Sequence, residues 1–220
     1  MSYKKIPNIS ARDIATILGI NPYQTPYQLL EDKIEKKYPF FGNKFTDHGN
    51  KYENQAIKSF EKYIGSCINK EQVSIHHSEY KWITGRLDGI IEHSDSKKRK
   101  RTKQISVIEV KCPLKEDRND ELTEDNIPIQ YWSQCQVYMN LINVDYTYYV
   151  EYYIKPDDDP DNAKLYVIKI KRNNKWWETS LPKIILFYEE MKIYYEKGNL
   201  ETHPVRIAEN LWKQKFMQTK

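Results

Sequence analysis

The chain has 220 residues, of which 30% are charged, and its formal net charge is +4, a mild basic bias that is compatible with a nucleic-acid partner. This length allows one globular domain with a core of its own, and no apolar run approaches the ~20 residues of a membrane-spanning helix. The three cysteines are widely spaced and form no CxxC pair, which argues against a zinc site and a four-cysteine iron–sulfur cluster.

The N-terminal part of the chain predicts helices. Ser10 is a candidate N-cap, and the apolar residues that follow it recur at helical spacing. Thr25 and Pro26 are typical of the cap and the first position of a second helix. A longer helix is expected to begin after a cap at Thr46 or Asp47.

The middle of the chain changes to the patterns of strands. Short apolar or alternating runs occur at residues 73–75, 82–91 and 105–110. Residues 94–103 form a polar, basic connection between the last two runs, and residues 114–126 are acidic and predict a loop.

The last third of the chain predicts a helix, two strands and a helix. The first of these helices begins at Pro128, whose ring is suited to a helix start. Residues 146–154 and 164–170 predict two strands, and residues 181–196 predict the final helix. This order of elements indicates a single domain of the α/β or α+β class.

Two short segments carry the candidate chemistry: GRLDGII, residues 85–91, and IEVKCP, residues 108–113. The side-chain period of two points Glu109 and Lys111 to one face of their strand, and Asp88 can join them if the two strands are neighbours. Two carboxylates with room for water and phosphate oxygens suit Mg²⁺. The lysine can orient or help deprotonate an attacking water and offset charge on the phosphate.

Each segment alone has an ordinary explanation, because Glu-x-Lys also occurs on solvated edge strands and Asp-Gly in turns. The pair is harder to explain in this way. The flanking Val and Ile residues predict buried strands, and a buried strand does not carry Glu and Lys on one face without a reason. We therefore interpret the two segments together as a metal-dependent site.

Several blocks resemble, in the same order, the YqaJ/lambda-exonuclease family of viral recombination nucleases, which belongs to the PD-(D/E)xK superfamily. The blocks are residues 9–26, 48–56, 82–89, 109–113 and 131–139. The most specific parts are Glu-x-Lys-Cys-Pro and the Tyr-x-x-Gln-x-Gln pattern. The resemblance is strongest over residues 9–140. It implies one α/β, restriction-endonuclease-like exonuclease domain over residues 1–220, with a central mixed sheet flanked by helices.

The resemblance also implies the roles of the matched residues at the metal. Asp88, Glu109 and the main-chain carbonyl of Val110 would bind Mg²⁺, for which Mn²⁺ is expected to substitute. Lys111 would act on the nucleophilic water. Glu53 would complete the site from its helix, directly or through metal-bound water; its alternative is an ordinary exposed helical Glu.

The Tyr-x-x-Gln-x-Gln helix would supply two further residues. Gln134 would hold the catalytic lysine or a water in place, and Tyr131 would lie near the DNA. Helical spacing agrees, because Tyr131, Gln134 and Tyr138 share one helix face. The alternative for Gln134 is a half-buried polar residue that bonds the backbone.

Two positions depart from the family pattern. Arg86 and a leucine stand where members have a small residue and Pro before the metal-binding Asp, and Arg86 can reach a phosphate. The family's Arg before the opening Ser is also missing. Ser10 would therefore bind a 5′-phosphate with the help of Lys4, Lys5 or Arg12.

The basic run from Lys97 to Arg101 has three interpretations. It is a solvated turn, a DNA-backbone contact beside the active site, or a nuclear import signal. The sequence leaves the three open.

The resemblance implies a DNA exonuclease that acts 5′ to 3′ on double-stranded DNA ends and produces 3′ single strands for annealing recombination. A single-strand annealing protein is the candidate partner and a homo-oligomer the candidate assembly, with no membrane. The odd cysteine count and the lack of a signal peptide predict an intracellular protein, in the host cytoplasm or nucleus if viral. The alternatives are a restriction-type or structure-specific endonuclease of the same fold, and a catalytically silent DNA-binding module.

Overall fold

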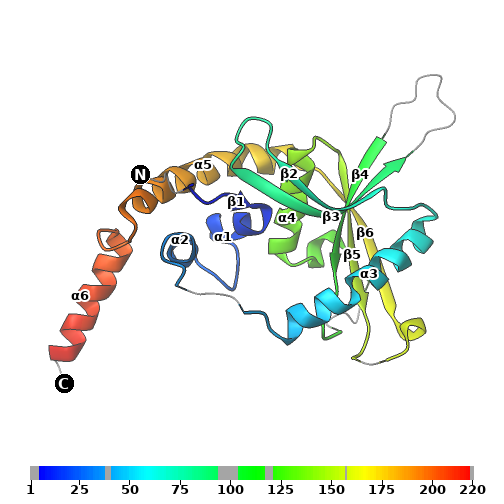
Figure 1. Ribbon diagram of the computed structural model, residues 1–220, viewed down its shortest axis with the longest axis horizontal. Helices are drawn as coiled ribbons and strands as arrows, with labels where there is room; N and C mark the ends of the chain where they lie inside the picture. The colour runs from blue at the N-terminus through cyan, green and yellow to red at the C-terminus, as the bar shows by residue number, and fades with distance from the viewer. Residues whose placement is uncertain (1–4, 38–40, 94–103, 117–120, 157, 219–220) are drawn as a thin grey trace.

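The computed structural model describes residues 5–37, 41–93, 104–116, 121–156 and 158–218 (Figure 1). The basic run from Lys97 to Arg101 and the lysine at position 4 lie outside these residues. No helix in the described part of the chain is long and apolar enough to cross a membrane.

A mixed sheet lies at the centre of the molecule (Figure 1). Its strands are β1 (Ile9–Ser10), β2 (Lys70–His76), β3 (Ile83–His93), β4 (Gln104–Lys111), β5 (Tyr146–Tyr153) and β6 (Lys164–Lys171). The order is β1-β3-β4-β5-β6, and β2 pairs with β3. The pairs β1–β3 and β4–β5 are parallel, whereas β2–β3, β3–β4 and β5–β6 are antiparallel.

One edge of β3 is shared by two strands. Thr84 pairs with both β1 and β2, and Gly89 pairs with both β2 and β4. Because a strand has only two edges, β1 and β4 lie on the same edge of β3, opposite β2. Residues 85–88 lie between the two partners on this edge, and the candidate site is built there.

Helices cover both faces of the sheet. They are α1 (Ile14–Ile17), α2 (Pro26–Glu35), α3 (Lys44–Ile64), α4 (Ile129–Leu141), α5 (Asn174–Lys197) and α6 (Pro204–Gln218). Short 3-10 turns occupy Ala11–Asp13, Glu124–Asn126 and Pro160–Asn162. One hydrophobic cluster joins α1, α2, α4 and α5 to the sheet, and a second joins α3 to residues of β3, β4 and β5. The expected mixed sheet flanked by helices is confirmed.

Two helix starts differ from the sequence prediction. α3 begins at Lys44, because the Asn43 side chain accepts hydrogen bonds from the N–H groups of Phe45 and Thr46 at 2.9 and 3.1 Å. The last predicted helix begins at Asn174 rather than near residue 181 and runs through Pro182. The predicted first helix is a 3-10 turn followed by the four residues of α1.

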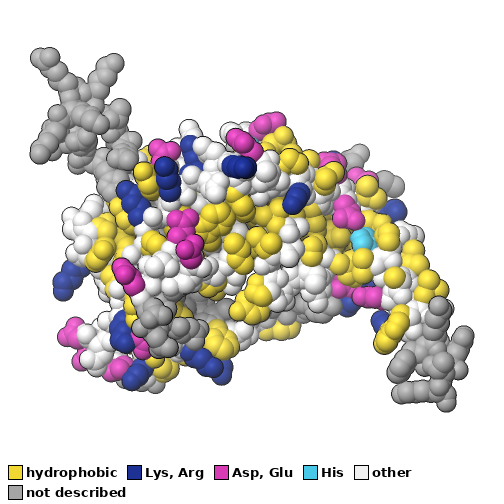
Figure 2. Space-filling view, turned by 180° about the vertical axis from the view of Figure 1, so that it is seen from behind, with side chains coloured by type: hydrophobic (Ala, Val, Ile, Leu, Met, Phe, Trp, Pro, Cys, Tyr) yellow, Lys and Arg dark blue, Asp and Glu magenta, His cyan; other side chains and the backbone are white. Residues whose placement is uncertain are grey.

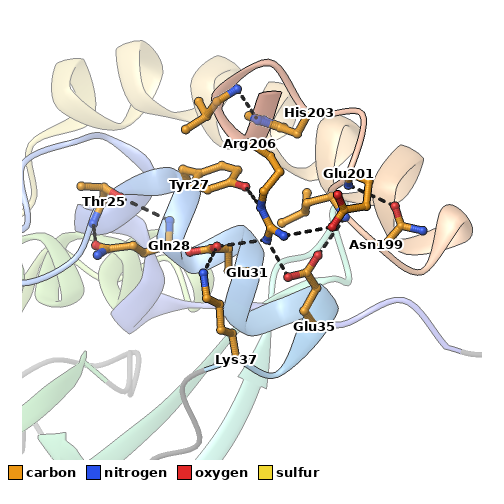
Figure 3. A network of polar contacts seen from close by, with 12 residues as sticks. Thr25, Tyr27, Gln28, Glu31, Glu35, Lys37, Asn199, Glu201, His203 and Arg206 are labelled. Atoms are coloured by element: carbon orange, nitrogen blue, oxygen red, sulfur yellow. Dashed lines mark hydrogen bonds and ion pairs between the residues drawn. The ribbon is translucent and has the colours of Figure 1, made fainter. Parts of the chain in front are cut away.

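The C-terminal helix α6 was not expected, and it projects from the body of the molecule (Figure 1). Its first turn is anchored by Arg206. The guanidinium donates to the Tyr27 hydroxyl at 2.9 Å and to Glu35 at 2.8 Å, and it also pairs with Glu31 and Glu201 (Figure 3). These contacts hold α6 against α2.

Beyond its first turn, α6 leaves large apolar side chains in solvent. Leu211 and Trp212 are exposed, as are Leu186 and Ile193 of α5. Figure 2 shows the side of the molecule opposite to Figure 1, where hydrophobic side chains occupy much of the middle and charged ones are scattered around them.

Candidate active site

The side-chain alternation of β3 reverses at Asp88. A Cβ atom on Gly85 would meet Tyr138 of α4, and Leu87 belongs to the cluster on that face. A Cβ atom on Gly89 would instead meet Ile68 and Ile108, which pack with the α3 cluster. The strand therefore changes the face of its odd-numbered residues between Leu87 and Gly89, and Asp88 lies at the change.

At this position the side chain of Asp88, rather than its main chain, makes the hydrogen bond to β4. The register between β3 and β4 ends at the pair Gly89 and Ile108, and beyond this pair the Val110 N–H donates to Asp88 Oδ2 at 2.8 Å. Asp88 is 7% exposed, and this hydrogen bond holds its carboxylate against β4. The structure brings Asp88 and the Glu109–Lys111 segment together, as the spacing predicted.

Glu109, which is buried, forms an ion pair with the partly buried Lys111. Both lie on β4, and the Lys111 ammonium donates to Glu109 Oε1. Burial and the negative charge of Asp88 together raise the pKa of Glu109 to about 7, against the opposing charge of Lys111. Burial disfavours the Lys111 ammonium, but the negative charges of Glu109 and Asp88 outweigh it and raise the pKa of Lys111.

The ring of Tyr131, in the first turn of α4, lies beside the ammonium of Lys111. The Lys111 Nζ atom lies 4.9 Å from the centroid of the Tyr131 ring, a distance that allows a cation–π contact. The Tyr131 ring stacks in turn on Tyr149 of β5, with centroids 6.3 Å apart. The start of α4 thus reaches the candidate site.

Gln134 reaches the site indirectly. Its amide donates to the Tyr138 hydroxyl at 2.6 Å, and that hydroxyl donates to the carbonyl oxygen of Arg86 at 2.7 Å. This carbonyl lies on the edge of β3 between β1 and β4, so α4 holds the strand that carries Asp88. A role of Gln134 toward Lys111 or a water stays a prediction.

The second glutamine of the Tyr-x-x-Gln-x-Gln pattern has a structural role. Gln136 is fully buried, and its amide donates to the Lys171 carbonyl at 2.9 Å. Its Oε1 atom accepts from the Asn173 N–H at 2.7 Å. Asn173 caps α5, so Gln136 fixes the turn that leads from β6 into α5.

Glu53 faces the site from α3. Its carboxylate accepts a hydrogen bond from the Gln72 amide, and Gln72 Oε1 accepts from Arg86 Nε. Burial and the charge of Asp88 raise the pKa of Glu53, which is consistent with closely spaced carboxylates. Gln72 was missed by sequence reasoning, because nothing in the pattern around it distinguishes it from an ordinary polar strand residue.

Ser10 and Arg12 stand at the start of the shared edge of β3. β1 pairs Ser10 with Thr84, and the exposed Arg12 follows in the 3-10 turn. The Ser10 N–H donates to Asp13 Oδ2 at 2.7 Å, and Asp13 pairs with Lys33. The positive charge of Arg12 favours the charged forms of Glu53 and Glu109, which places it near both.

The donor groups fit a divalent cation. Glu109 Oε2 is buried and has no hydrogen-bond partner, and Asp88 uses Oδ2 for the Val110 N–H. Hard carboxylate and carbonyl oxygens are the ligands that Mg²⁺ and Mn²⁺ accept. No group of three or more His, Cys, Asp or Glu side chains gathers for a metal among the residues described.

The sheet order, the covering helices and the Asp/Glu-x-Lys cluster together define a restriction-endonuclease-like protein of the PD-(D/E)xK type. A family model of the YqaJ-like viral recombinase domain matches residues 4–145. The match spans more than half of the chain, and the chain belongs to this family.

Two sequence relatives are described as uncharacterised proteins. The protein R354 of Acanthamoeba polyphaga mimivirus is 29% identical over 149 residues, which are 64% of this chain and 26% of that protein. The protein YqaJ of Bacillus subtilis strain 168 is 25% identical over 139 residues, which are 63% of this chain and 40% of that protein. The matched part thus spans less than half the length of either relative.

Solved structures share the fold. An alkaline exonuclease from Laribacter hongkongensis has a TM-score of 0.69 at 16% identity, with 87% of this chain and 91% of that chain covered. A phage-related exonuclease from Haemophilus somnus 129PT has a TM-score of 0.60 at 19% identity, with 88% and 95% covered. The Laribacter enzyme has also been solved in complex with dAMP, with a TM-score of 0.65 at 15% identity and 92% and 95% covered.

Proposed function

We propose that the protein is a magnesium-dependent DNA exonuclease that digests linear duplex DNA from 5′ to 3′ and leaves 3′ single strands for annealing. The observation that carries the proposal is the cluster of the buried Asp88 and Glu109 with Lys111, in which Glu109 Oε2 has no hydrogen-bond partner. A carboxylate oxygen buried in this state costs stability unless a cation or a proton occupies it.

Each residue of the cluster has a distinct part. Asp88, Glu109 and the Val110 carbonyl would hold Mg²⁺, which when bound activates a water and offsets charge on the phosphate. Glu53 would hold a water at the same site from α3. Manganese meets the same ligand requirements and is expected to substitute.

Lys111 acts through its charge. Its pKa is raised by Glu109 and Asp88, against the effect of burial, so the side chain stays an ammonium at neutral pH. An ammonium can orient the attacking water and offset the charge that develops on the phosphate, but it has no lone pair with which to take a proton. The raised pKa therefore favours electrostatic stabilisation by Lys111 over general-base catalysis.

The relatives and the site support DNA as the substrate class. Two solved structures that share this fold are exonucleases, and one of them has been solved in complex with dAMP, the class of nucleotide that an exonuclease releases from DNA. Arg12, Arg86 and Tyr131 would contact the DNA, since guanidinium groups bind phosphates and an aromatic ring stacks on bases.

The proposal extends to partners and location. The family name and the proposed product support action with a single-strand annealing protein in recombination. Assembly into a homo-oligomer and action inside the cell that holds the DNA belong to the same proposal.

A digestion assay tests the function. A linear duplex labelled at one end and a covalently closed circle of the same sequence are incubated with Mg²⁺, and EDTA samples serve as controls. The proposal expects digestion of the linear duplex alone, with mononucleotides released from the 5′ end. Cutting of the closed circle would identify an endonuclease, and binding without any cutting would identify a silent DNA-binding module.

A further inference from the structure

Gln72 has an unusual backbone for its place in the fold. Three non-glycine residues in the described part of the chain have positive φ: Lys36, Gln72 and Asn143. Lys36 and Asn143 follow the ends of helices, where left-handed residues are common. Gln72 has a φ of 52° within strand β2, where a residue with a Cβ atom is normally extended.

Gln72, the residue with this left-handed backbone, lies opposite Asp88 of β3. Glu71 pairs with Gly89 and Val73 pairs with Leu87, so Gln72 faces Asp88 without being registered as its partner. The alternation of β3 reverses at the same level, and the Asp88 carboxylate turns there toward the Val110 N–H. Both strands thus leave the regular ladder at the same point, beside the site.

The Gln72 side chain bridges two residues of opposite charge. Its NH₂ group donates to the Glu53 carboxylate on α3, and its carbonyl oxygen accepts from Arg86 Nε on β3. Both ends of the amide are assigned by these partners, because the carboxylate only accepts and the guanidinium only donates. Arg86 makes no other side-chain hydrogen bond with the described residues, so its exposed terminal amino groups can bind a phosphate.

We infer that Gln72 is a positioning residue of the active site, which holds Glu53 toward the Asp88 carboxylate and orients Arg86 toward a phosphate of the DNA. The inference rests on the proposed nuclease function. A left-handed residue in a strand is stable only where its surroundings compensate for it, and such residues gather at functional sites. The two bonds to charged groups are the compensation that the structure provides here.

The substitution Gln72→Asn separates positioning from a purely structural role. Asn adopts the left-handed backbone more readily than Gln, which offsets the loss of the bridging bonds, so the melting temperature should change little. Its side chain is one methylene shorter and cannot span both partners. We expect kcat on a linear duplex to fall by about tenfold to a hundredfold, as for the loss of a hydrogen bond to a charged group.

Lys36→Asn is the matched control. Lys36 has nearly the same φ, 51°, but lies at the end of α2. The same exchange of a left-handed residue for Asn should leave kcat unchanged there. A loss of activity that is specific to Gln72→Asn then comes from the bridge and not from the backbone.

A binding measurement tests the part that Arg86 plays. Fluorescence anisotropy with a labelled duplex, in Ca²⁺ to suppress cleavage, should show weaker binding by Gln72→Asn. In an Arg86→Ala background the same substitution should lower kcat without a further change in Kd. A purely structural residue would not produce this division between kcat and Kd.

The outcomes are distinct. Wild-type kcat and Kd in Gln72→Asn would overturn the inference. If that variant does not fold, Gln72→Gly replaces it, since glycine accepts the backbone without strain; wild-type kcat and Kd in folded Gln72→Gly would again overturn it. If the wild-type protein cuts no DNA, the proposed nuclease function is refuted independently of Gln72. In that case unchanged DNA affinity in Gln72→Asn would still refute the inference that Gln72 orients Arg86 toward the DNA.

Discussion

The Asp88 carboxylate accepts a hydrogen bond from the main-chain N–H of Val110 at 2.8 Å, across the point where β3 and β4 separate. The bond fixes one carboxylate oxygen on the backbone of the strand that carries Glu109 and Lys111. The position of Asp88 thus depends on main-chain geometry rather than on the neighbouring side chains. Substitutions at this residue can therefore be chosen to change its charge without removing the bond.

Asp88→Asn should lower the rate of cleavage strongly and leave the fold intact. The Asn side-chain oxygen can still accept from Val110, but the site loses a negative charge and a metal ligand, and we expect a loss on the order of a thousandfold. Asp88→Ala should in addition lower the free energy of unfolding by about 1–3 kcal/mol, because the Val110 N–H is left unpaired. Digestion of an end-labelled duplex and urea unfolding measure both effects. Asp145→Asn, at an exposed carboxylate, is the control, and wild-type cleavage by Asp88→Asn would refute the assignment.

Lys111→Met should separate catalysis from metal binding. Removal of the ammonium lowers the cleavage rate strongly, but it leaves the affinity for Mg²⁺ or Mn²⁺ equal or higher, because a neighbouring positive charge opposes a cation. Isothermal titration on both proteins, together with single-turnover digestion, measures the two effects. Lost metal affinity with an unchanged rate per bound metal would contradict the electrostatic role of Lys111.

Stability should depend on pH and on metal through Glu109. Its pKa is raised from 4.5 to about 7, so the folded state holds this proton more tightly than the unfolded chain. The stability from this proton is complete below about pH 4.5 and is lost as the pH rises through about 7, a change on the order of 3 kcal/mol at about 1.4 kcal/mol per pKa unit.

A cation needs the deprotonated carboxylate, and Mg²⁺ should therefore raise the melting temperature more at about pH 8 than at about pH 5.5. Differential scanning calorimetry of the protein with and without Mg²⁺ at both pH values measures this. The difference should vanish in Glu109→Gln. An equal shift at the two pH values in the wild-type protein would argue against Glu109 as the ligand.

Tyr138→Phe should loosen β3 beside the site. The change removes the hydroxyl that joins Gln134 to the Arg86 carbonyl and leaves buried polar groups unpaired, at a cost of about 1–3 kcal/mol in unfolding free energy. The effect of Gln134→Ala should be smaller in the Tyr138→Phe background, because both substitutions break the same chain of bonds. Urea unfolding of the four proteins measures this coupling, and additive effects would show that the two residues act separately.

The preference for a 5′-phosphate should be modest. The Ser10 N–H is already bonded to Asp13, whose negative charge disfavours an anion at this turn. Arg12 is the exposed guanidinium nearby, so Arg12→Ala should reduce the preference more than Ser10→Ala. Time courses on duplexes that differ only in the 5′ group measure it. A preference of about a thousandfold, or 4 kcal/mol, would reveal a phosphate clamp that these residues do not explain.

Local sequence signals predicted most elements but misplaced several ends. The strands over residues 82–91 and 105–110 and the helix after Pro128 are confirmed, because alternation and helix-start chemistry act over a few residues. The predicted start of the last helix, near residue 181, was wrong. α5 begins after its cap Asn173, whose N–H is bonded to the buried Gln136, 37 residues earlier in the chain. The turn that begins α6 depends likewise on Arg206 meeting α2, which no local pattern reveals.

The sequence by itself determined the chemistry available to the site: an Asp on one strand, Glu-x-Lys on another and a Tyr-x-x-Gln-x-Gln helix, all in the order of the family. Only the tertiary structure decided how these groups meet. Gln134 bonds Tyr138, and Gln72, which has no sequence signal, joins Glu53 to Arg86. The physical reason is that side-chain types and strand periods are local properties. The level at which two strands separate, and the partner that a buried amide finds there, depend on how distant elements pack.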